Sequence, residues 1–147
     1  MKTEMLWRAL PRKIRETLTG KELEKMQEIR LRCGRPAFAR GRDGQIRELT
    51  EEITAADLRE TVSLLSAYSL YAFEEELKQG YLTVAGGHRV GFCGKTVMEN
   101  GEIRTLKQIN GLNIRIAAEK KGWGEEYLSD LMEEGCVCNT LIISPPG

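Results

Sequence analysis

The spacing of hydrophobic residues changes near residue 81, from every third or fourth position to every second position. A period of two is typical of half-buried strands, whereas a period near 3.6 indicates helices. Turn-forming dipeptides separate the alternating segments, namely Gly86-Gly87, Asn100-Gly101 and Asn110-Gly111. The sequence therefore predicts an antiparallel meander of four strands, over 81–85, 88–97, 102–106 and 112–117.

The segments before residue 81 predict helices around a group of three short strands. Apolar residues at helical spacing indicate two helices in 5–18, interrupted at Pro11, and 20–27 indicates a further helical turn or two. Alternation places Ile29 and Leu31 on one face of a strand and Arg30 and Arg32 on the other. The other two strands, 37–40 and 45–49, are predicted to form a hairpin at the Asp43-Gly44 pair.

Two further helices are expected between these strands and the meander. Thr54 and Asp57 have the spacing of a capping box, and Leu58, Val62 and Leu65 follow at helical intervals. A second helix over 70–79 is expected to end at Gly80.

The C-terminal part predicts one helix and one strand of a different kind. Residues 122–135 are expected to form an amphipathic helix that ends at Gly135, with Tyr127, Leu128, Leu131 and Met132 facing inward. The unbroken apolar run 137–144 suits a strand buried on both faces, as found in parallel sheets. The expected fold class is therefore α+β, followed by the first strand of an α/β domain.

Composition excludes several function classes. Lysine plus arginine and aspartate plus glutamate both number 22, so whole-chain attraction to nucleic acid or to an anionic membrane is not implied. No apolar stretch reaches the ~20 residues of a membrane span, and no signal peptide precedes the first helix, so a cytoplasmic location is expected. The four cysteines lack zinc-site spacing and are expected to be reduced and mostly buried, so no metal site is predicted.

Two glycine-containing stretches bear on nucleotide binding. Gly94-Lys95-Thr96 has the letters of a phosphate loop, but the first glycine is missing and the segment lies inside the meander. Without a following helix it lacks the free N–H groups that hold phosphate. Ser144-Pro145-Pro146-Gly147 has the opposite properties, because it follows a predicted buried strand but holds only the start of a loop. By itself this is a weak signal, because Pro-Pro-Gly is also a plain turn.

Four segments together resemble the sporulation stage III protein AA family, namely "EIRLRCGRP", "YSLYAFEEELKQGYLTVAGGHRVGFCG", "LNIRIA" and "NTLIISPPG". The resemblance covers nearly the whole chain and is tightest over 28–38 and 68–94. It implies the cytosolic ATPase of the channel complex between mother cell and forespore in endospore-forming bacteria. Members continue the Ser-Pro-Pro-Gly loop into Gly-Lys-Thr and a RecA-like core, although Ser144 departs from the general phosphate-loop motif.

The resemblance implies a division of the chain and a set of partners. Residues 1–135 would be a PAS-like N-terminal domain, and 136–147 the first strand and partial phosphate loop of a truncated RecA-like domain. The full-length protein would bind ATP and magnesium, whereas this chain would hold neither and would not hydrolyse ATP. Expected partners are other subunits in a hexameric ring and membrane-embedded proteins of the channel, with the protein peripherally associated in the mother-cell cytoplasm.

More distantly, the layout is similar to the N-terminal domains of type II secretion and type IV pilus ATPases, in which arginines on the last strands reach toward the nucleotide. Arg89 and Arg115 occupy similar places. Alternation puts Val90 on the face opposite Arg89, and Ile114 and Ile116 opposite Arg115, so both guanidinium groups are expected on the polar face of the sheet. They would either meet nucleotide phosphates or pair with nearby glutamates.

A second basic group lies in the first strands. Six arginines fall within eighteen residues, namely Arg30, Arg32, Arg35, Arg40, Arg42 and Arg47. Three interpretations are open: solvated or internally paired charge, docking of a subunit or partner through Arg30, Arg32 and Arg35, or a nucleic-acid-binding module. The last has little support from aromatic residues, because Phe38 alone is available for base stacking. His88 is expected to make a structural hydrogen bond.

Overall fold

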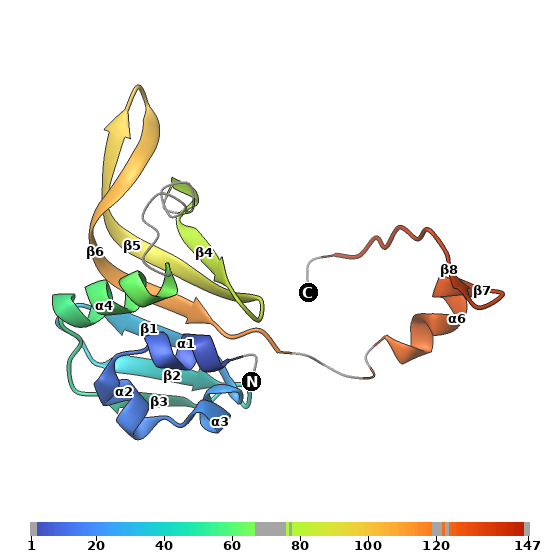
Figure 1. The fold of residues 1–147 in the computed structure, drawn as a ribbon, viewed down its shortest axis with the longest axis horizontal. Coiled ribbons are helices and arrows are strands. Elements are labelled where there is room, and N and C mark those ends of the chain that lie inside the picture. The colour runs from blue at the N-terminus through green and yellow to red at the C-terminus, as the bar shows by residue number, and fades with distance from the viewer. Residues whose placement is uncertain (1–2, 67–75, 77, 119–121, 123, 146–147) are drawn as a thin grey trace.

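The structure, a computed structural model, describes residues 3–66, 76, 78–118, 122 and 124–145. Its centre is an antiparallel sheet of six strands, in the order β3-β2-β1-β6-β5-β4, with helices packed on one face (Figure 1). The strands are β1 (Met26–Arg32), β2 (Ala37–Gly41), β3 (Ile46–Thr50), β4 (Tyr81–Val84), β5 (His88–Glu99) and β6 (Glu102–Arg115). The predicted α+β class is confirmed.

The helices that cover this face come from two parts of the chain. They are α1 (Glu4–Ala9), α2 (Arg12–Thr17), α3 (Gly20–Leu23) and α4 (Ala55–Leu65). The break at Pro11 is confirmed, and Pro11 is the N-cap residue of α2. The Thr54–Asp57 capping box at the start of α4 is confirmed too, and α3 starts with a second one, Thr19–Glu22, that sequence analysis missed.

The core lies between the helices and one face of the sheet, where strand alternation places apolar residues. Ile29 and Leu31 of β1 are fully buried while Arg30 is exposed, as predicted. Val90 of β5 and Ile114 of β6 occupy the same apolar layer. Because β1 pairs with β6, the three N-terminal strands and the meander form one sheet with one core.

The meander has three strands, and the prediction of four was wrong. Residues 102–115 form the single strand β6, and the expected turn at Asn110-Gly111 lies inside it. Gly111 pairs with Arg32 on one side and with Cys93 on the other, so two neighbouring strands override the local turn preference. The irregularity falls instead near Gln108, whose φ is 51°.

The other turns confirm their sequence signals. Asp43-Gly44 joins β2 to β3, Gly86-Gly87 joins β4 to β5, and Asn100-Gly101 joins β5 to β6 with φ angles of 53° and 84°. The helix expected over 70–79 falls largely outside the described residues. Gly80 follows helical residues 78 and 79 with a φ of 79°, as expected of a glycine that ends a helix.

The prediction of one inward-facing helix over 122–135 was wrong. The segment forms a 3₁₀ turn, η1 (Glu125–Tyr127), a single α-turn, α6 (Leu128–Leu131), and a small hairpin of β7 (Met132–Glu133) and β8 (Cys136–Val137). Tyr127, Leu128 and Met132 are exposed by 48%, 49% and 41%. With these side chains about half exposed, the amphipathic pattern buries too little apolar surface to stabilise a longer helix.

The expected buried strand over 137–144 is also absent. Residues 138–145 form no strand, and Leu141, Ile142 and Ile143 are exposed by 83%, 77% and 86%. A strand of a parallel sheet needs neighbouring strands, and the described part of the chain supplies none beside this segment. The assignment of 136–147 to a RecA-like domain stays a prediction.

The expectation of mostly buried cysteines was wrong as well. Cys33, Cys93 and Cys136 are exposed and Cys138 is half-buried, all four as free thiols. Cys93 is exposed because it alternates with buried Phe92 on the solvent side of β5. In the described ranges, no three His, Cys, Asp or Glu residues gather as metal ligands, and no helix has the length and apolarity to cross a membrane.

Candidate functional site

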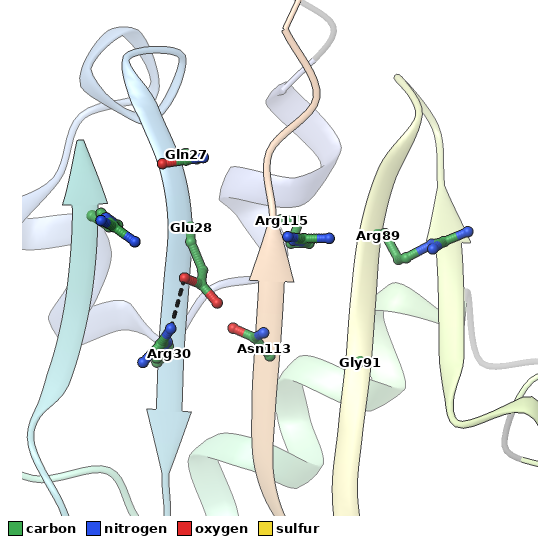
Figure 2. A pocket seen from close by; sticks show the side chains of 8 residues that line it. Gln27, Glu28, Arg30, Arg89, Gly91, Asn113 and Arg115 are labelled. Carbon is green, nitrogen blue, oxygen red and sulfur yellow. Dashed lines mark hydrogen bonds and ion pairs between the residues drawn. The ribbon is translucent and has the colours of Figure 1, made fainter. Parts of the chain in front are cut away.

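The face of the sheet opposite the helices carries a row of charged residues from four adjacent strands. Strand register pairs Arg40 of β2 with Glu28 of β1, Glu28 with Arg115 of β6, and Arg115 with Arg89 of β5. Paired residues on neighbouring strands point to the same face, so the four side chains stand side by side. This confirms the prediction that Arg89 and Arg115 share the polar face (Figure 2).

A groove of about 440 Å³ runs over this row. Figure 2 shows Glu28 and Arg30 on β1 at one side, Asn113 and Arg115 on β6 in the middle, and Arg89 beyond them on β5. Gly91, between Tyr81 and Asn113 in the strand register, contributes no side chain to the floor. The residues that line the groove are Gln27, Glu28, Arg30, Arg40, Arg89, Gly91, Asn113 and Arg115.

One carboxylate lies among the four arginines of the groove. Arg30 Nη2 donates to Glu28 Oε2 at 3.1 Å. This hydrogen bond lowers the pKa of Glu28 against the opposing effect of burial, and Asn113 and the charge of Arg115 lower it further. Glu28 is therefore ionised at neutral pH, and its strongest interaction is the hydrogen bond from Arg30.

The remaining arginines keep their hydrogen-bond donors available. The guanidinium carbon of Arg89 lies 4.2 Å from the centroid of the Tyr81 ring, a cation–π contact that leaves the edge N–H groups free to donate. Arg40 and Arg115 are exposed, and the charge of Arg115 acts on Glu28, whose hydrogen-bonded partner is Arg30. The groove thus has a surplus of positive charge, which favours an anion.

A smaller apolar hollow of about 320 Å³ continues from the groove toward β3. It shares Glu28, Arg30 and Arg40 with the groove and adds the exposed side chains of Phe38 and Ile46.

The predictions from the sequence did not include four groove residues, namely Gln27, Glu28, Gly91 and Asn113. Alternation alone places Glu28 with Arg30 and Asn113 with Arg115, so that signal was present in the sequence. Only the strand order shows that these pairs are neighbours.

The six-arginine group of β1 to β3 is divided rather than gathered. Arg30 and Arg40 line the groove, whereas Arg35 is exposed outside it. Arg32 Nη1 donates to the carbonyl oxygens of Leu31 and Leu112 at 2.9 and 3.1 Å. The other two also have internal partners, the Ile116 carbonyl oxygen for Arg42 and the Glu22 carboxylate for Arg47.

Two other predictions about single residues are confirmed. Lys95 lies within β5 opposite Lys107, so its Gly-Lys-Thr letters belong to a strand and not to a phosphate loop. His88 is buried, and its Nδ1 accepts a hydrogen bond from the Ala117 backbone N–H at 3.0 Å.

The start of the expected phosphate loop can be followed only in part. Ser144 is exposed, and its hydroxyl donates to the Pro145 carbonyl oxygen at 3.0 Å. Pro146 and Gly147 lie outside the described residues, so the role of these four residues stays a prediction.

Comparison with known proteins places the chain in a family. The family profile described as "Sporulation stage III, protein AA" matches residues 1–147. The chain belongs to this sporulation family. Stage III sporulation protein AA of Bacillus subtilis (strain 168) is 46% identical over 121 residues, which cover 82% of this chain and 39% of that protein. The match therefore takes in well under half of this curated relative from the sporulation family.

Among solved structures, the VirB11 ATPase from the Brucella suis type IV secretion system, in complex with sulphate, resembles this member of the sporulation family distantly. The match has a TM-score of 0.40 and 14% sequence identity, and it covers 72% of this chain and 31% of that one. A likeness at this level assigns no function.

Proposed function

We propose that this chain is the N-terminal domain of a sporulation ATPase, and that its groove presents Arg89 and Arg115 to the phosphates of a nucleotide held by the motor domain. The observation that carries the proposal is the pairing of these two arginines, at adjacent positions of β5 and β6, in a groove with surplus positive charge. Membership of the sporulation family supports the biological setting.

The chemistry of the groove suits a phosphoryl group. A guanidinium group offers two parallel N–H donors and keeps its charge, so two neighbouring ones can surround a phosphate oxygen cluster. Two like charges directly opposed across strands repel each other, and an anion between them relieves that repulsion. In the transition state of phosphoryl transfer, such groups stabilise the charge on the equatorial oxygens.

ATP and magnesium fit this chain only in part. The arginine groove suits phosphate, whereas the described residues contain no group of acidic or histidine ligands for a metal ion. The motor domain would therefore hold magnesium, and Ser144, Pro145, Pro146 and Gly147 would begin its phosphate loop. This chain supplies cations to a nucleotide bound elsewhere.

The proposal includes assembly and docking. We expect the domain to help the full-length protein form a hexameric ring and to contact membrane-embedded proteins of the channel from the mother-cell cytoplasm. Arg35 is exposed outside the groove, so it is the member of the predicted docking set with the freest access to a partner. Arg30 is shared with the groove, and Arg32 is held by backbone carbonyl groups.

The decisive experiment uses the full-length protein. Arg89→Ala and Arg115→Ala should each lower kcat for ATP hydrolysis, by up to about 10³-fold if the arginine meets the γ-phosphate. Lys95→Ala and Arg104→Ala are matched controls, because Lys95 lies in a strand outside the groove and Arg104 is paired with Glu99. Unchanged kcat in both groove variants would rule out a role for the arginines in nucleotide chemistry.

A second measurement concerns residues 1–147 alone. This chain should show no ATP turnover, because it lacks the lysine that would hold the β- and γ-phosphates. Turnover that disappears in Lys95→Ala would contradict this interpretation.

Nucleic-acid binding is the alternative function, and the divided arginine group gives it less support. It predicts an affinity that falls steeply with salt. A filter-binding titration with single-stranded DNA at two ionic strengths measures this directly. Tight binding at the lower ionic strength that Arg30→Ala and Arg40→Ala abolish would favour the alternative.

A further inference from the structure

Gly91 is a glycine that the fold does not require. It lies within β5, and its φ is outside the left-handed region that favours glycine. A Cβ at this position would have its nearest neighbours, the Asn113 carbonyl oxygen and Cβ, at 3.8 and 3.9 Å, which is ordinary contact. By contrast, a Cβ at Gly94 or Gly111 would lie 2.7 Å from another side chain.

A glycine inside a strand has a stability cost and usually a reason. It weakens the strand, because it adds no packing and loses more backbone entropy than other residues. Since neither backbone conformation nor crowding explains Gly91, the remaining common reason is that something approaches the backbone closely. Gly91 forms part of the groove floor, so that space faces the arginine row.

The groups around Gly91 match one kind of ligand. Arg89 lies two positions before it on β5, and Arg115 stands opposite Arg89 on β6. Asn113, the cross-strand partner of Gly91, has a buried side-chain oxygen, Oδ1, with no hydrogen-bond partner. The two guanidinium groups beside the open space over Gly91 suit a phosphate-like anion.

Tyr81 holds the Arg89 side chain beside this space. It is the other cross-strand partner of Gly91, and its ring stacks under the Arg89 guanidinium group. In Figure 2 the Arg89 side chain extends toward β4, away from Arg115, and Gly91 lies further along β5, level with Asn113, so the space over Gly91 borders the arginine pair. A side chain larger than glycine at position 91 would project into that space.

We infer that Gly91 is a specificity-determining residue that keeps open a subsite for a phosphoryl group over the Gly91–Asn113 pair, next to the Arg89–Arg115 pair. The inference rests on the proposed function and adds to it the place where the phosphate lies. It also explains why a strand interior has a glycine where the backbone tolerates any residue.

The test compares two substitutions at one position. Alanine at position 91 adds only the tolerated Cβ, whereas leucine fills the groove. Both keep the charge, and both should keep the melting temperature or raise it slightly, because glycine weakens a strand interior. Titration of residues 1–147 with inorganic pyrophosphate, followed by NMR shifts of β5 and β6, should give weak binding on the order of millimolar Kd. Gly91→Leu should weaken it at least about tenfold, the value of one charge-assisted hydrogen bond, and Gly91→Ala much less.

The same pair of variants in the full-length protein gives the second readout. Gly91→Leu should lower kcat for ATP as strongly as Arg115→Ala does, while Gly91→Ala stays near the parent value. If Arg89→Ala and Arg115→Ala lower kcat but Gly91→Leu changes neither kcat nor pyrophosphate affinity, the subsite is wrong and the proposed function survives. If the arginine variants also have no effect, the proposed function fails.

A vesicle-binding experiment distinguishes a free phosphate ligand from the phosphate of a lipid headgroup. Vesicles of phosphatidylcholine with phosphatidylglycerol carry the same phosphate chemistry on an extended surface instead of on a free anion. We expect no co-sedimentation of residues 1–147 that depends on Gly91. Vesicle binding abolished by Gly91→Leu, without pyrophosphate binding, would overturn the assignment to a compact soluble phosphate.

Discussion

Arg89 and Arg115 stand directly opposite each other on β5 and β6, on the face of the sheet that no described helix covers. The next residue in the row, Glu28, lies opposite Arg115 but hydrogen-bonds to Arg30. Glu28 thus acts on Arg115 only through its charge, and its hydrogen bond goes to Arg30 rather than to either of these two neighbouring guanidinium groups. Such an arrangement has a cost in an isolated domain and a benefit when an anion binds.

The contact between Arg89 and Tyr81 should be measurable as a coupling energy. Arg89 lies over the Tyr81 ring at 4.2 Å, and a partly exposed cation–π contact contributes about 0.5–1 kcal/mol. A double-mutant cycle with Arg89→Ala and Tyr81→Leu, followed by urea unfolding, should give a coupling of that size. Tyr81→Phe keeps the ring and should keep most of it. A coupling near zero would show that the stack does not form in solution.

His88 should prove structural. Its Nδ1 accepts the Ala117 N–H at 3.0 Å, and the side chain is 1% exposed. His88→Ala removes the acceptor and opens a cavity, so it should lower the free energy of unfolding by about 2–4 kcal/mol. His88→Asn offers an oxygen near the position of Nδ1 and should recover part of this loss. Equal unfolding midpoints for the two variants would contradict a role for the hydrogen bond.

Stability should fall in acid partly through Asp57. Burial raises the pKa of this carboxyl group, but hydrogen bonds from Lys13 and Thr54 outweigh it, so the folded pKa lies below the ordinary value of 3.8. The contribution is therefore fully present above pH 3.8 and is lost as the pH falls through the folded pKa. Melting temperatures of the parent protein and Asp57→Asn should differ most at neutral pH and converge in acid. A constant difference between pH 7 and pH 2 would contradict this assignment.

Gly111 should behave in the opposite way to Gly91. A Cβ there would lie 2.7 Å from Arg32 Cδ and 3.0 Å from the Leu31 carbonyl oxygen. Gly111→Ala should therefore lower the free energy of unfolding by about 1–3 kcal/mol, as overpacking does. Arg32→Ala should remove part of that cost but not the contact with the backbone. Gly91→Ala is the control, and its unfolding midpoint should stay near that of the parent protein.

Much of the local structure could be predicted because its causes are local. Pro11 divides the first helices, the Thr54–Asp57 pair begins α4, and the alternation of β1 separates Ile29 from Arg30. Burial period and capping depend on residues a few positions apart, so a single sequence displays them. The same locality explains why alternation placed Arg89 and Arg115 on a polar face.

Predictions were wrong where distant residues compete with local preference. Asn110-Gly111 has the chemistry of a turn, yet it continues β6 because β1 and β5 pair with it on both sides. Leu141 and its neighbours have the chemistry of a buried strand, yet they are exposed, because the described residues offer them no neighbouring strand.

The sequence by itself determined which side chains of each strand face water, and it placed the chain near a sporulation family. Only the tertiary structure decided that β1 pairs with β6, which brings Glu28 and Arg30 beside Asn113 and Arg115 and closes the groove. The physical reason is that side-chain alternation follows from the backbone of one strand, whereas the choice of neighbour depends on burying a core shared by the whole chain.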